Sequence, residues 1–76
     1  MVTRARRKPL GYYLKLKYPI TLVEDPNGGY FVEIKELEGC MSQGETATEA
    51  IQNIEEAKKL WMEIAYEDGI KIPEPK

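Results

Sequence analysis

The chain of 76 residues is predicted to fold as a single α+β domain, with a three-stranded antiparallel sheet and one long helix packed on one face. Two observations predict this architecture. Residues 12–43 contain apolar segments separated by two glycine-containing turns, which is typical of strands joined by hairpins. Residues 46–68 repeat apolar side chains at helical spacing behind a capping sequence. The expected order is therefore β-β-β-α.

The first strand is predicted over residues 13–24. Alternate apolar side chains would share one face of this strand: Leu14, Leu16, Tyr18, Ile20 and Leu22. Pro19 interrupts the segment and removes one backbone hydrogen-bond donor. This strand is therefore expected at an edge of the sheet, or with a bulge or a late start at the proline.

Two turns define the next strands. Asp25-Pro26-Asn27-Gly28-Gly29 is predicted to be a hairpin loop, because proline presets φ and the Asn-Gly-Gly sequence accepts positive φ values. A return strand is then expected over residues 30–36. Residues 36–39 turn the chain again, which leaves residues 40–43 for a short third strand.

The helix is predicted over residues 46–68. Thr46 and Glu49 have the spacing of a capping box, and Gly69 is placed to end the helix. A short fourth strand over residues 70–72 is an open alternative. Ten apolar side chains are expected to be mostly buried in the core: Leu14, Leu16, Ile20, Leu22, Val32, Ile34, Ile51, Ile54, Trp61 and Ile64.

Charge is divided unevenly along the chain. Residues 1–17 carry six basic and no acidic side chains, whereas the remainder carries five basic and thirteen acidic ones. Residues 1–11 are therefore predicted to be a basic, disordered arm, and residues 12–76 a single acidic domain. An acidic body favours a basic protein partner over nucleic acid. Weak nucleic-acid binding through the arm stays open, and its basic side chains are Arg4, Arg6, Arg7 and Lys8.

The composition excludes several kinds of chemistry. Histidine is absent, which removes histidine-dependent ribonuclease activity, a Ser-His triad and a histidine-containing zinc site. Cys40 is the sole cysteine, so neither an internal disulfide nor a thiolate metal site can form, and we expect a buried small side chain there. The chain is predicted to be neither an enzyme nor a cofactor or metal binder. It has no apolar run of membrane-spanning length, and we expect it in the cytoplasm.

Several segments together resemble the N-terminal domain of HicB-like antitoxins. They are Tyr18-Pro19-Ile20-Thr21-Leu22, Gly28-Gly29-Tyr30, Leu37-Glu38-Gly39-Cys40-Met41-Ser42-Gln43-Gly44-Glu45-Thr46, Glu49-Ala50, Glu67-Asp68-Gly69 and Ile72-Pro73. The resemblance covers about residues 12–75, and members of the family often have proline where Glu38 stands here. It implies a form often likened to a degraded ribonuclease-H fold. Family members usually continue into a C-terminal DNA-binding domain, whereas this sequence stops at Lys76, as expected for a stand-alone domain.

The resemblance also implies a partner, a small basic HicA-type toxin that cleaves RNA with a catalytic histidine and is occluded by the antitoxin. The groups expected to contact this partner are Glu33, Glu36, Glu38 and Gln43. Because a domain of this size buries only about 60% of its unfolded surface, we also expect a homodimer or higher homo-oligomer. The alternative is an oligomeric interaction module that has no toxin.

Overall fold

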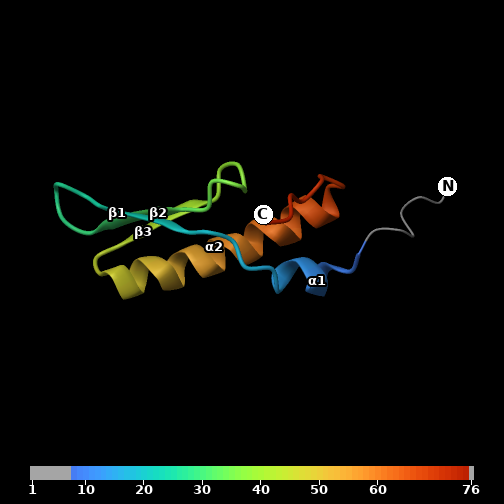
Figure 1. Cartoon of the computed structure of the whole chain (residues 1–76), viewed down its shortest axis with the longest axis horizontal. Helices are drawn as coiled ribbons and strands as arrows, with labels where there is room; N and C mark the ends of the chain where they lie inside the picture. Colours follow the sequence, from blue (N-terminus) through green and yellow to red (C-terminus); the bar gives the residue numbers. More distant parts are fainter. Residues whose placement is uncertain (1–7, 76) are drawn as a thin grey trace.

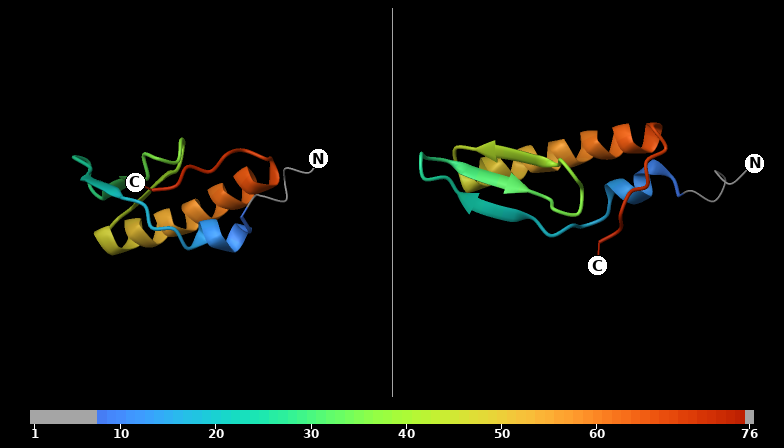
Figure 2. Two further views of the ribbon diagram at one scale, coloured as in Figure 1. Left: turned by 45° about the vertical axis from the view of Figure 1, so that its right-hand side comes forward. Right: turned by 90° about the horizontal axis from the view of Figure 1, so that it is seen from above.

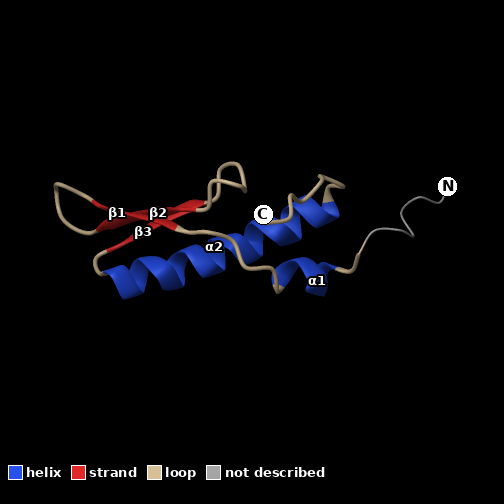
Figure 3. Cartoon of the chain, in the orientation of Figure 1, coloured by secondary structure: helices blue, strands red, loops and turns tan. Residues whose placement is uncertain are grey.

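The computed structural model describes residues 8–75, which form two helices and three strands. Their order along the chain is α1 (Leu10–Leu14), β1 (Thr21–Glu24), β2 (Tyr30–Glu33), β3 (Met41–Gly44) and α2 (Ala47–Glu67). The sheet forms one layer and α2 lies along one of its faces, with α1 beside the C-terminal half of α2 (Figures 1 and 3). This arrangement confirms the predicted α+β fold class with its antiparallel sheet and single long helix.

The sheet has the order β1-β2-β3, and both strand pairs are antiparallel. Val32 lies in the middle, opposite Leu22 on β1 and Ser42 on β3. Because side chains alternate along a strand, these three residues point toward α2 and their neighbours point away from it. Both β1 and β3 are edge strands within the described residues.

The predicted hairpin loop forms at residues 25–29. The Asp25 carboxylate accepts a hydrogen bond from the Asn27 amide at 2.8 Å, and the Gly28 amide donates to the Asp25 carbonyl at 2.9 Å. Gly28 and Gly29 have φ values of 103° and 83°, which side chains with a Cβ rarely adopt. The turn is therefore encoded locally, by the residue types that the sequence places there.

Helix α2 begins as the sequence predicts. The Thr46 side chain accepts from the Glu49 amide at 3.1 Å. The Glu49 carboxylate accepts from the amide of Glu45 at 2.6 Å, whereas a standard capping box would use the amide of Thr46. The helix then passes over β3 and β2. The two come very close at Gly44, where an added Cβ would lie 2.5 Å from the Ala50 nitrogen. Glycine at this position thus allows the helix to pack directly on the sheet.

The predicted strand over residues 13–24 is wrong in its first two thirds. Leu10–Leu14 is the helix α1, an extended segment follows, and the strand begins only at Thr21, after Pro19. This late start was one of the predicted outcomes for the proline. The expected boundary between arm and domain at residue 11 falls inside α1, and residues 1–7, with Arg4, Arg6 and Arg7, lie outside the described residues.

The difference in length between α2 and the strands explains why this segment leaves the sheet. A helix of 21 residues is about 32 Å long, whereas a strand of four residues spans only about 14 Å. The C-terminal half of α2 therefore extends beyond the sheet. The segment before β1, α1 and the C-terminal segment cover it instead (Figure 2).

The core lies between α2, β2 and the turn that follows β2. Val32, Ile34 and Ile54 are buried as predicted. Leu22 and Ile64 are 40% and 50% exposed, so both predictions were wrong. Leu22 points toward the helix side, but α2 does not extend over β1. The other predicted core residues are half-buried: Leu14, Leu16, Ile20, Ile51 and Trp61.

The alternative of a fourth strand is also wrong, because residues 70–72 form no strand in the structure. The Ile70 amide donates to the Ala65 carbonyl at 2.9 Å, and Ile72 is buried against the core. This segment therefore follows the helix rather than pairing with the sheet. Within residues 8–75, neither helix has the length and apolarity required to cross a bilayer.

Candidate partner-binding surfaces

One face of the sheet has no helix over it. We call it the outer face, and it carries the strand residues that point away from α2: Thr21, Val23, Phe31, Glu33, Met41 and Gln43. Val23 and Met41 are each 50% exposed. An apolar surface with a carboxylate in it is suited to binding another protein.

The four predicted contact residues are distributed over more than one surface. Glu33 and Gln43 both lie on the outer face, on neighbouring strands, and Gln43 is exposed whereas Glu33 is half-buried. Glu38 is exposed in the turn between β2 and β3. Glu36 is half-buried, and its Oε1 atom is buried without a hydrogen-bond partner among the described residues. The structure thus places Glu33 and Gln43 on one face of neighbouring strands and buries one carboxylate oxygen of Glu36.

A groove of about 280 Å³ lies between this turn and the end of α2, and we call it the Trp61 groove. Its lining residues are Glu38, Trp61, Ile64, Ala65 and Ile70. The Trp61 indole nitrogen donates to the Glu38 carbonyl at 2.8 Å, which fixes the turn against the helix. The sequence placed Trp61 and Ile64 in the core, so this groove was not predicted.

The end of α2 positions Ile70 in this groove. Gly69 has a φ of 73°, its amide donates to the Tyr66 carbonyl at 3.3 Å, and the Ile70 amide donates to the Ala65 carbonyl. These two bonds form a Schellman motif, which commonly brings the residue after the glycine against the last turn of the helix. Gly69 was the only sequence signal for this wall of the groove.

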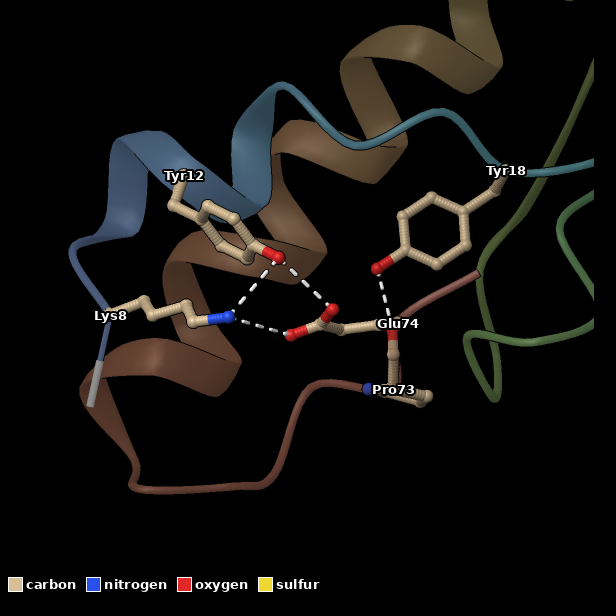
Figure 4. Close-up of polar contacts among 5 residues, drawn as sticks. All are labelled: Lys8, Tyr12, Tyr18, Pro73 and Glu74. Atoms are coloured by element: carbon tan, nitrogen blue, oxygen red, sulfur yellow. Dashed lines mark hydrogen bonds and ion pairs between the residues drawn. The ribbon is translucent and has the colours of Figure 1, made fainter. Parts of the chain in front are cut away.

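The N-terminal and C-terminal segments meet in a cluster of polar contacts, shown in Figure 4. The Lys8 Nζ lies 3.3 Å from the Tyr12 hydroxyl and 3.7 Å from a Glu74 carboxylate oxygen, and the Tyr12 hydroxyl donates to Glu74 at 3.0 Å. The Tyr18 hydroxyl donates to the Pro73 carbonyl at 2.6 Å. Lys8, one of the four basic side chains proposed for nucleic acid, is therefore engaged within the fold.

Two of these groups have shifted pKa values. Burial raises the pKa of Tyr18 to about 12, and the negative charge of Glu36 contributes to the same shift. The hydrogen bond with Tyr12 and the charge of Glu74 raise the pKa of Lys8, so it stays protonated. Both shifts favour the protonated side chains that make the contacts.

The remaining candidates for chemistry are structural. Cys40 is buried and unpaired, as predicted, and burial raises the pKa of its thiol, an effect that the charge of Lys58 opposes. Lys58 is itself buried and donates to the Leu16 carbonyl at 3.0 Å. No cluster of three or more metal-ligating side chains occurs in the described part of the chain. The surfaces described above are therefore the best candidates for function.

Comparison with known proteins supports a protein-binding role. The sequence profile described as "HicB_like antitoxin of bacterial toxin-antitoxin system" matches residues 18–76. The chain belongs to the HicB-like antitoxin family. It is 35% identical over 60 residues to the antitoxin HicB of Escherichia coli K12, a match that covers 79% of this chain and 44% of the antitoxin.

Two shorter proteins are similar to this chain over most of their length. A UPF0150 protein of Synechocystis is 38% identical over 58 residues, which is 76% of this chain and 80% of that protein. A UPF0150 protein of Thermoplasma acidophilum is also 38% identical over 58 residues, and the match covers 84% of it. Family membership gives the chain an antitoxin role in a toxin-antitoxin system, and thus a toxin as partner in general.

Proposed function

We propose that the chain binds a small, basic, RNA-cleaving toxin of the HicA type and occludes its active site. Family membership is the main support for this proposal, and the charge of the chain also supports it. Residues 18–76 have a net charge of −8, which attracts a basic protein. The lack of histidine agrees with the antitoxin rather than the toxin of such a pair, because the toxin needs a catalytic histidine. The chain therefore acts by binding rather than by catalysis, in the cytoplasm where the toxin meets RNA.

Within this proposal, Glu33, Glu36, Glu38 and Gln43 contribute to the contact in different ways. Glu33 and Glu38 act as charges that speed up the encounter with a basic surface, since charges at an interface rim act mainly on the association rate. Gln43, exposed beside Glu33, offers a hydrogen-bonding amide. Glu36 is half-buried with one oxygen in the interior, so it contributes its negative charge rather than a hydrogen bond through that oxygen.

The proposal extends to self-association. The strand β1 is an edge strand with unpaired backbone groups, and its Leu22 and Val23 side chains are 40% and 50% exposed. Such an edge is a template for pairing with another strand. A homodimer or higher homo-oligomer formed through this edge would bury these side chains. Sedimentation at micromolar concentrations is expected to show more than one copy per particle, and a monomer throughout would contradict this part of the proposal.

Association kinetics test the toxin proposal. The probe is the small basic protein that the proposal expects to be encoded beside this chain, with its catalytic histidine replaced by alanine. Reversing two charges with Glu33→Lys and Glu38→Lys should slow association, most strongly at low salt, because screening already weakens these charges at high salt. Glu36 is left unchanged, since its buried oxygen makes a fold defect the expected result of reversal.

A control with the same change in net charge isolates the position of these charges. Glu24→Lys and Glu45→Lys reverse two exposed carboxylates at the opposite end of the sheet. This variant should associate faster than the Glu33 and Glu38 variant. Equal rates for the two variants would show that only net charge matters. If the unaltered chain does not bind the basic protein, the proposed function is wrong and the oligomeric module without a toxin replaces it.

A further inference from the structure

An apolar strip along one flank of α2 is left in solvent. Leu60, Ile64 and Ile70 are 57%, 50% and 51% exposed. Leu60 and Ile64 are four residues apart and so lie on the same side of the helix. Ile64 and Ile70 also line the Trp61 groove. The strip and the groove therefore form one continuous apolar surface, which is a mark of a binding site on a small domain.

The walls of this surface are fixed before any partner binds. The Trp61 indole is held by its bond to the Glu38 carbonyl, and the Schellman motif at Gly69 holds Ile70. Ala65, between them, is only 3% exposed and forms the floor of the groove. Binding here would order few groups, and such preorganisation lowers the entropic cost of association.

The rim of this surface is acidic. Glu38 lines the groove itself, and Glu63 and Glu67 lie three residues beyond Leu60 and Ile64 on the same side of the helix. The basic side chains nearest in sequence are Lys59, next to Leu60, and Lys71, next to Ile70, so carboxylates outnumber basic groups around this surface. An apolar centre bordered by carboxylates is complementary to an apolar side chain flanked by lysine or arginine.

The same rim disfavours a second copy of the chain at this position. A symmetric contact through the groove would bring Glu38, Glu63 and Glu67 of each copy toward those of the other. Like charges placed together at an interface are unfavourable. The β1 edge carries Glu24 and Asp25 beside Val23, but unlike the groove it offers unpaired backbone groups to a second strand, so it is the better position for self-association.

We propose that the Trp61 groove and the Leu60–Ile64 strip are the anchoring site for a basic protein partner, which inserts an apolar side chain between Trp61 and Ile70. This inference rests on the proposed function and specifies the surface that holds the toxin once it has met the chain. The acidic groups would then set the association rate, while the groove sets the dissociation rate, as is typical of buried anchors.

The variant Ile64→Glu tests this assignment. It makes the chain more acidic, so attraction by charge alone would leave binding of the basic protein unchanged or stronger. An apolar anchoring site predicts the opposite result, with Kd raised by at least ~30-fold, mainly through faster dissociation. Gln52→Glu is the control for the added negative charge, because Gln52 is exposed on the same helix and lies in none of the proposed binding surfaces. It should leave Kd for the basic protein within about threefold of the parent value.

Each outcome decides between clear alternatives when circular dichroism shows that both variants retain the fold. Weak binding by the Ile64 variant alone supports the groove. Equal binding by both variants, or weak binding by the Gln52 variant alone, overturns it while the proposed function stands. Failure of the unaltered chain to bind overturns the proposed function itself. If Ile64→Glu changes only the number of copies in the particle, the groove is a self-association surface and the inference is wrong.

Discussion

Gly44 is the position where a single methyl group should most disturb the packing of α2 on the sheet. Its φ is not positive, so alanine meets no backbone strain there and acts only through the added volume. An added Cβ would lie 2.5 Å from the Ala50 nitrogen, 2.8 Å from the Ala50 Cα and 2.9 Å from the Glu49 carbonyl carbon. All three neighbours are backbone atoms of α2, so relief requires the helix itself to move.

The size of this effect follows from the contacts. Ordinary Cβ contacts begin at 3.4 Å, so the helix must retreat by about 1 Å at Ala50, which is fully buried. A gap of that size forfeits about a quarter to a half of the dispersion energy of the contacts across it. Overpacking of this kind costs about 1–3 kcal/mol, against a total stability of roughly 4–11 kcal/mol for a chain of this length.

Thermal unfolding followed by far-UV circular dichroism measures this cost. Gly44→Ala should lower Tm by about 4–24 °C, given that 1 kcal/mol corresponds to about 4–8 °C for a domain of this size. Gly11→Ala is the matched control, because Gly11 lies in α1 with nothing within 4 Å of an added Cβ. The control should raise Tm slightly through the better helix propensity of alanine. A Gly44→Ala variant as stable as the parent would refute the close approach of helix and sheet.

Three further changes test the local interactions. Tyr18→Phe should abolish a loss of folding stability that the parent chain shows between about pH 10 and 12. Because the pKa of Tyr18 is about 12 in the folded state and about 10 in the unfolded state, its contribution to stability is fully present below pH 10 and falls as the pH rises. Urea midpoints of the variant that match those of the parent at several alkaline pH values would contradict this. Thr46→Ala should cost about 1 kcal/mol by removing the helix cap, and urea unfolding that is unchanged would show the cap to be unimportant. Ile54→Ala should lower the free energy of unfolding by about 2–5 kcal/mol, because Ile54 is fully buried. A smaller decrease would mean that the surrounding core collapses into the cavity.

The elements predicted correctly are those whose signals are local. Asp25, Gly28 and Gly29 define the hairpin by their own hydrogen bonds and backbone angles, without help from distant residues. Thr46 and Glu49 likewise cap α2 within one turn of the chain. Family motifs lie mostly in these same segments, which explains why both the resemblance and the fold class could be read from the sequence.

The segment before β1 could not be predicted correctly, because alternating apolar residues show that one side of the segment is buried but not which element buries it. Leu14, Leu16 and Tyr18 alternate as in a strand, but they pack with α2 and the C-terminal segment instead of a neighbouring strand. The deciding fact is that α2 is longer than the sheet. That mismatch appears only when the lengths of separate elements are compared in three dimensions.

The binding surfaces were only partly predictable for a similar reason. Helical spacing groups Trp61 and Ile64 with the buried residues of α2. In the structure, however, the buried face of the helix ends between these two residues, so Ile64 is half-exposed. Glu36 stands among charged turn residues in the sequence, but the fold places one of its oxygens in the interior. Whether a residue at the edge of a buried face is itself buried depends on tertiary packing, which sequence periodicity does not specify.

The central claim is that this HicB-like chain inactivates a basic RNA-cleaving protein by covering its active site. The most direct measurement is RNA cleavage by the basic protein that we expect to be encoded beside the chain, kept catalytically active, as increasing amounts of the purified chain are added. Cleavage should fall in proportion to the added chain and reach background near equimolar amounts, as expected for tight occlusion of the active site. Undiminished cleavage at a large molar excess of folded chain would contradict the claim.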